Sequence, residues 1–108
     1  MSWKIVFVSR TAEDEVTALP LDMRSRFAKI ADLIIQNGLQ RVHEPYVKHV
    51  EGKLWEMRLN GADGIARSIY FASSGERVVV LRTFIKKTES TPRREIEIAL
   101  RRMKEFGK

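Results

Sequence analysis

Leu54-Trp55-Glu56-Met57-Arg58-Leu59 is the stretch where the chain changes from a helical to an extended pattern. Apolar residues stand at its second, fourth and sixth positions, and the charged Glu56 and Arg58 stand between them. A two-residue period of this kind predicts a strand with one apolar and one polar face. We therefore expect a sheet with one face against the core and one face in water.

Two more strands should follow, because short turns divide the next apolar runs. Asn60 through Gly64 and Ser73 through Glu76 are rich in residues that favour turns. The apolar runs at residues 65–72 and 77–85 are therefore expected to be strands, and three consecutive strands joined by short turns form an antiparallel meander. Residues 41–53, which precede the meander, show no clear period and receive no predicted element.

The first forty residues predict a strand and two helices. Residues 3–8 form a β-branched and aromatic run, which is typical of a buried strand. Thr11 and Asp14 have the spacing of a capping box, so a first helix is expected to begin there. Pro20 fits the first turn of a second helix, and Gly38 would end it. The two helices should form an antiparallel αα-hairpin.

A last helix is expected after the meander. Thr91 can cap its N-terminus, with Pro92 at the first helical position. Its inward stripe would consist of Ile96, Ala99, Leu100 and Met103. The predicted order is βααβββα. This is an α+β fold with a small, largely antiparallel sheet, an N-terminal αα-hairpin and a C-terminal helix, in a single domain, residues 1–108.

The chain is strongly basic. Its 20 lysines and arginines outnumber its 14 aspartates and glutamates, which gives a formal net charge of +6. Small domains of this charge commonly bind polyanions, most often nucleic acid, although solubility alone is an alternative explanation. The basic residues crowd the second half of the chain, so we expect the partner surface there.

The sequence lacks several residue types and motifs, and their absence excludes several functional classes. The chain has no cysteine, which excludes disulfides, thiolate metal sites and a cysteine nucleophile. It also lacks a Gly-rich phosphate loop, GxSxG, HExxH and any cluster with metal-ligand spacing, so we expect no metal and no cofactor. No apolar run approaches the length of a membrane span, and no signal-peptide pattern opens the chain, so we expect a cytoplasmic protein.

A few residues remain as candidates for chemistry. His43 and His49 could act as an acid and base pair, or more simply be ordinary loop histidines. Arg67 interrupts an apolar run, where a guanidinium needs either a buried ion pair, for example with Glu56, or an open cleft in which it binds phosphate. The lysines at positions 86 and 87 end the third strand of the meander, either at the rim of that cleft or as a solvated strand end.

Four motif blocks resemble the phage-derived branch of the RelE/HigB toxin superfamily. They are LWEMR at residues 54–58, ARSIY at 66–70, FIKKTESTP at 84–92 and EIEIA at 95–99, in the order and spacing of that family. Together with the expected N-terminal strand and αα-hairpin, the resemblance covers nearly the whole chain.

The resemblance implies the toxin of a type II toxin–antitoxin system with a compact RelE-like fold. Such a toxin is an endoribonuclease (an mRNA interferase) that cleaves mRNA in the ribosomal A site and so inhibits translation. Its implied partner is a cognate antitoxin, commonly a helix-turn-helix protein, which would cover the basic surface or wedge against the last helix. The alternative is a non-catalytic module of the same fold that binds RNA or protein.

The resemblance also implies candidate roles for individual residues. By position, Arg67 matches the arginine of the family's second meander strand, and Lys86 or Lys87 matches the basic residue that ends the next. Glu56 and Arg58 stand where better-known relatives have two lysines.

These candidates suggest a metal-independent attack of the RNA 2′-hydroxyl on the neighbouring phosphate. Arg58 and Arg67 would stabilise the developing charge, Lys86 and Lys87 would exchange protons, and Glu56 would be the base. We expect Lys86 to matter more than Lys87, because it continues the face that includes Phe84. RNA contacts are expected from Lys53, Arg82, Arg93 and Arg94.

Overall fold

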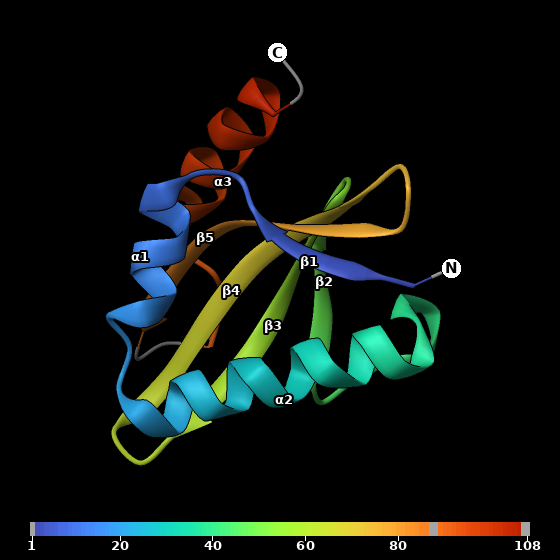
Figure 1. The fold of residues 1–108 in the computed structure, drawn as a ribbon. Helices are drawn as coiled ribbons and strands as arrows, with labels where there is room; N and C mark the ends of the chain where they lie inside the picture. The colour runs from blue at the N-terminus through green and yellow to red at the C-terminus, as the bar shows by residue number, and fades with distance from the viewer. Residues whose placement is uncertain (1, 87–88, 107–108) are drawn as a thin grey trace.

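The computed structural model describes residues 2–86 and 89–106. Its elements, in chain order, are β1 (Lys4–Phe7), α1 (Arg10–Thr17), α2 (Leu21–Asn37), the 3₁₀ turn η1 (Leu39–Arg41), β2 (Val47–Glu51), β3 (Leu54–Gly61), β4 (Gly64–Ser73), β5 (Arg77–Lys86) and α3 (Arg93–Glu105) (Figure 1). Within the described ranges, no helix is both long and apolar enough to cross a membrane.

The strands form one sheet in the order β1-β5-β4-β3-β2. The predicted meander is confirmed as β3, β4 and β5, which pair antiparallel, whereas β1 pairs parallel to β5. The structure adds β2 at the edge, in the segment that showed no sequence period. Only Val47 of this strand is fully buried, and Lys48 and His49 are exposed. An edge strand with one core residue carries too weak an apolar alternation to be recognised from the sequence.

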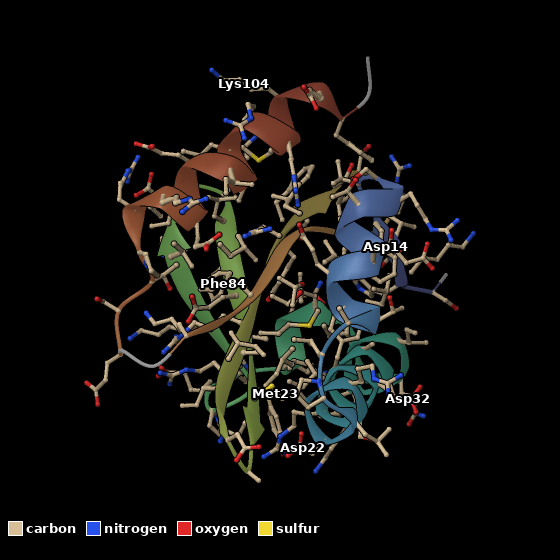
Figure 2. All side chains as sticks on the ribbon, turned by 90° about the vertical axis from the view of Figure 1, so that its left-hand side faces the viewer. Asp14, Asp22, Met23, Asp32, Phe84 and Lys104 are labelled. Carbon is tan, nitrogen blue, oxygen red and sulfur yellow. The ribbon has the colours of Figure 1, made fainter. Side chains whose placement is uncertain are left out.

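Helices cover both faces of the sheet. Figure 2 views the sheet nearly edge on, with α1 and α2 on one side and α3 on the other. Met57 and Leu59 are fully buried on the α2 side, as their alternation predicts. The expectation of a polar face in water is wrong for Glu56, which is buried on the α3 side together with Arg67. Their charges are accommodated because they pair with each other.

The helix ends differ in detail from those expected. Ser9 rather than Thr11 caps α1, because Ser9 is extended and its Oγ accepts a hydrogen bond from the Ala12 amide at 3.1 Å. Gly38 ends α2 as predicted, with φ of +87°. Thr91 does not cap α3, since its hydroxyl donates to the Glu56 carboxylate instead. The first helical residue there is Arg93.

Candidate functional site

The strand register brings three of the candidate cations onto one face of the sheet. Arg58 on β3 lies directly opposite Arg67 on β4, and Arg67 lies opposite Phe84 on β5. Lys86 is two residues beyond Phe84 and therefore projects from the same face. Directly paired residues share a face, so Arg58, Arg67 and Lys86 form one cluster, which we call the basic cluster.

Arg67 and Glu56 form the most deeply buried ion pair of the described residues, each with a side chain about 2% exposed. The Nη1 atom of Arg67 donates to the Glu56 carboxylate, and its Nη2 atom donates to the backbone carbonyl of Glu89 at 2.7 Å. The second carboxylate oxygen of Glu56 accepts from the Thr91 hydroxyl. The pair therefore attaches residues 89–91, which lead into α3, to the surface of the sheet.

The sequence left two explanations for Arg67, a buried ion pair with Glu56 or a phosphate-binding cleft, and the structure contains the ion pair. Both terminal nitrogens of Arg67 are engaged internally, while its Nε is buried and has no hydrogen-bond partner in the described ranges. Phosphate binding by Arg67 stays a prediction. Glu56 as a general base is poorly compatible with this geometry, because both carboxylate oxygens accept hydrogen bonds and the side chain is buried.

Lys86 is the unusual member of the basic cluster. The residue is only 8% exposed, and its buried Nζ has no hydrogen-bond partner among the residues that the structure describes. Burial lowers the pKa of Lys86 from its ordinary value, the positive charge of Arg67 lowers it further, and Glu56 acts in the opposite direction. At a given pH a larger fraction of this lysine than of a lysine in water is therefore in the neutral form, which is the form that can accept a proton. Lys87 lies outside the described residues.

Arg58 completes the cluster as a half-buried cation. Its backbone amide donates to the Tyr46 carbonyl at 2.9 Å, which fixes this end of β3. Its guanidinium makes no ion pair or side-chain hydrogen bond within residues 2–86 and 89–106. Arg58 is therefore available to an external anion, unlike the paired Arg67.

The residues expected to bind RNA fall into two groups. Lys53, in the β2–β3 turn, and Arg94, at the start of α3, are exposed. Arg93 is exposed but paired with Glu51 at 2.7 Å, an interaction that raises the pKa of Arg93. Arg82 is also paired internally. The open cations are thus Lys53 and Arg94, and RNA contacts by all of these residues stay a prediction.

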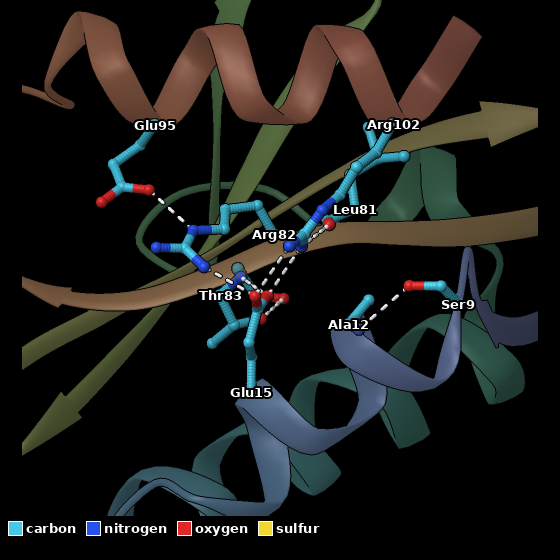
Figure 3. A network of polar contacts seen from close by, with 9 residues as sticks. Ser9, Ala12, Glu15, Leu81, Arg82, Thr83, Glu95 and Arg102 are labelled. Atoms are coloured by element: carbon cyan, nitrogen blue, oxygen red, sulfur yellow. Dashed lines mark hydrogen bonds and ion pairs between the residues drawn. The ribbon is translucent and has the colours of Figure 1, made fainter. Parts of the chain in front are cut away.

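Arg82 belongs to an ion-pair network centred on Glu15 of α1 (Figure 3). Arg82 bridges Glu15 at 2.6 Å and Glu95 of α3 at 2.7 Å. Arg102 of α3 donates to both Glu15 oxygens, at 2.9 and 3.0 Å, and the Thr83 amide donates to one of them at 3.2 Å. The network ties α1 and α3 to β5.

The sequence did not single out Glu15. Burial alone would raise its pKa, but the hydrogen bonds from Arg102 and the Thr83 amide and the charge of Arg82 outweigh burial and lower it. Glu15 and Arg102 are separated by 87 positions, so no local pattern links them.

The two histidines considered as an acid and base pair lie outside the basic cluster. His43 precedes β2 and His49 is on β2.

Comparisons with known proteins agree with this architecture. The family described as phage-derived Gp49-like proteins matches residues 14–104. A chain in the crystal structure of the archaeal RelE–RelB complex from Pyrococcus horikoshii OT3 superposes with a TM-score of 0.60 at 20% identity, over 79% of this chain and 96% of that one. No curated protein matches the sequence. The fold is therefore RelE-like, as expected.

Proposed function

The chain belongs to the family of phage-derived Gp49-like proteins, and from this premise we propose that it is the toxin of a type II toxin–antitoxin system. Membership of that family and the RelE-like fold confirm the resemblance that the motif blocks indicated. The proposed activity is cleavage of mRNA on the ribosome, in the cytoplasm, by an endoribonuclease that inhibits translation. The RelE–RelB complex supports a second proposal, that an antitoxin binds the chain. We further propose that this antitoxin is a helix-turn-helix protein.

The observation that carries the enzymatic proposal is the buried ammonium of Lys86, which lies beside Arg67 and has no hydrogen-bond partner in residues 2–86 and 89–106. A buried lysine without a hydrogen-bond partner is unfavourable for stability, and such groups gather at functional sites. Its lowered pKa increases the neutral fraction, which is the form that accepts a proton.

The proposed reaction needs only positioned acids, bases and charges. The 2′-oxygen attacks phosphorus as its proton passes to neutral Lys86, and the 5′-oxygen leaves with a proton, which gives a 2′,3′-cyclic phosphate and a 5′-hydroxyl. Arg58 stabilises the charge that develops on the non-bridging oxygens. Lys87 keeps its predicted role as the second proton-transfer residue.

In this proposal Glu56 and Arg67 are positioning residues. Arg67 lowers the pKa of Lys86 through its charge, and the pair holds residues 89–91 against the sheet beside the basic cluster. Glu56 thus supports the site through Arg67 and Thr91 rather than as the general base that the sequence suggested. Any direct contact of Arg67 with phosphate would use its Nε, which is buried and has no hydrogen-bond partner in the described part of the chain.

The test is cleavage of a defined mRNA on purified ribosomes by the wild-type chain, Lys86→Ala and Lys86→Arg. We expect cleavage by the wild type with a 2′,3′-cyclic phosphate end, and loss of cleavage in both variants, because arginine keeps the charge but does not release its proton. Lys104→Ala, a change at an exposed lysine of α3, is the matched control and should cleave normally. Full cleavage by Lys86→Arg would show that Lys86 acts only as a charge.

One observation favours a second candidate function. Both terminal nitrogens of Arg67 are occupied, so fewer cations are free for a transition state than the sequence suggested. A non-catalytic module could still bind RNA phosphates with Arg58, Lys53 and Arg94. Such a module would bind RNA in a salt-dependent manner and leave mRNA on the ribosome intact.

A further inference from the structure

The α2 side of the sheet contains a cavity that has no part in the proposed reaction. Its volume is about 830 Å³, and it lies between η1, the loop before β2, and strands β2 to β4. Rings dominate its lining, contributed by Trp3, His43, His49, Trp55 and Tyr70, and Lys48 is also part of the lining. The basic cluster projects from the other face of the sheet.

Trp55 is the most informative residue of this lining. It shares the core-facing side of β3 with Met57 and Leu59, which are fully buried, yet Trp55 is 39% exposed. The His49 ring contacts its indole edge-on, with centroids 5.0 Å apart, and His49 Nε2 lies 2.8 Å from the Gly52 carbonyl oxygen. The indole is thus held in place while a large part of its surface stays open.

Tyr70 supplies an independent polar observation. The residue is 1% exposed and lines the cavity, and its hydroxyl has no hydrogen-bond partner in the described part of the chain. Burial raises the pKa of Tyr70, so its phenol stays neutral and can both donate and accept a hydrogen bond. A ligand with a polar edge would satisfy this hydroxyl, whereas a purely apolar side chain would leave it unpaired.

We propose that this cavity binds an unstacked nucleobase of single-stranded RNA. Planar bases stack on open aromatic side chains whatever their sequence, and their edges carry the donors and acceptors that Tyr70 lacks. Lys48 lies at the rim of the cavity on the edge strand β2, is exposed, and is the cross-strand partner of Glu56, so its side chain projects from the face of the basic cluster, where it can pair with the phosphate of the adjoining nucleotide. Glu44 is the one carboxylate in the described lining. The inference rests on the proposed function, because it assumes that RNA is the ligand of this basic chain.

The geometry also connects the cavity to the basic cluster. Lys48 is the cross-strand neighbour of Glu56, and Glu56 is bonded to Arg67. Strand β2 is the edge of the sheet, so a single strand of RNA that crosses this edge passes from one face to the other. One nucleotide would be held in the cavity while another reaches the basic cluster.

The experiment measures binding of a fluorescently labelled RNA hexanucleotide to the full chain by anisotropy. The assay contains no ribosome, which the proposed cleavage requires, so the measured affinity does not depend on cleavage. We expect Trp55→Ala to weaken binding about tenfold, the loss of roughly one stacked base. Trp55→Phe should recover most of the affinity. Ile35→Ala, at an exposed apolar position of α2, is the control and should bind as the wild type does.

The salt dependence of RNA binding and a separate measurement of antitoxin binding distinguish the possible outcomes. Trp55→Ala should leave the slope of affinity against salt unchanged, whereas Lys48→Ala should reduce it by about one ion. Equal RNA affinity for Trp55→Ala and wild type, with unchanged thermal melting, would overturn the inference. So would a Trp55→Ala variant that loses antitoxin binding and keeps RNA binding, because the cavity would then dock protein. Trp55-dependent binding without any cleavage on ribosomes would support the cavity and reject the nuclease.

Discussion

Arg67 of β4 donates to the carboxylate of Glu56, its diagonal neighbour on β3, and this buried pair holds the segment before α3 through Glu89 and Thr91. The relationship links stability to the candidate site. A buried ion pair adds little net stability, but removal of one partner leaves an uncompensated charge. Variants of this pair therefore show whether Arg67 contributes to folding stability, to catalysis, or to both.

Arg67→Ala should lower the free energy of unfolding by about 3–5 kcal/mol, because Glu56 would stay buried without its counter-ion. The measurement is urea denaturation at pH 7, followed by far-ultraviolet circular dichroism. The double variant Glu56→Leu/Arg67→Met replaces both charges with apolar groups and should be about as stable as the wild type. A single Arg67→Ala variant of wild-type stability would contradict the buried pair.

The same double variant separates folding from chemistry. It should remain folded yet cleave ribosome-bound mRNA more slowly, because residues 89–91 lose their attachment to the sheet beside Lys86. The comparison is the cleavage rate of the double variant and the wild type at equal folded concentration. Equal rates would show that the pair serves the fold alone.

The activity should depend on pH through Lys86. Its pKa lies below the ordinary value of 10.5 in the folded chain, so the folded state favours the neutral lysine more than the unfolded state does. The cleavage rate should therefore rise with pH until it passes the lowered pKa and then level off. A rate that falls steadily across this range would contradict a role for neutral Lys86 as the base.

Stability gives a second readout of the same shift. Below the folded pKa the lysine is charged in both states and its burial is unfavourable, so Lys86→Met should be more stable than the wild type at neutral pH. This advantage should shrink as pH rises toward 10.5, where the unfolded lysine also loses its proton. Urea denaturation at several pH values measures the difference, with Lys104→Met as the exposed control.

Glu15 should be the acidic residue that contributes most to the stability of the contact between α1, β5 and α3. Glu15→Ala removes the shared partner of Arg82 and Arg102 and should lower the free energy of unfolding by about 2 kcal/mol. Asp14→Ala is the control, because its ion pair with Arg10 is solvent-exposed and should contribute under about 0.5 kcal/mol. Equal melting temperatures for the two variants would contradict a stabilising network.

Acid should weaken the same contact. The pKa of Glu15 is lowered on folding, so its contribution is present above its ordinary value of 4.5 and is lost as pH falls through the lowered value. The wild type should thus approach the stability of Glu15→Gln as the pH is decreased below 4.5. A difference between the two that stays constant with pH would contradict the lowered pKa.

The two-residue period at residues 54–59 predicted which side chains of β3 face the α2 core, because alternation is a local property of the strand. It did not predict that α3 and residues 89–91 cover Glu56, since that depends on the long-range register. The choice between an ion pair and a phosphate site at Arg67 was open for the same reason. The Glu15 network and the cavity at Trp55 join segments far apart in the chain, and no spacing in the sequence indicates them.

Arg58 is the more exposed cation of the basic cluster and has no internal side-chain partner among the described residues, so it gives the clearest test of charge stabilisation. Arg58→Ala should lower the cleavage rate about a hundredfold or more, equivalent to roughly 3–4 kcal/mol of transition-state stabilisation. Its melting temperature should hardly change, because the Arg58 guanidinium has no internal partner in the described residues. Arg58→Lys should recover part of the rate, since a lysine keeps the charge without the bidentate geometry. Arg101→Ala, at an exposed position of α3, is the matched control. If Arg58→Ala cleaves as fast as this control, the basic cluster does not stabilise the reacting phosphate.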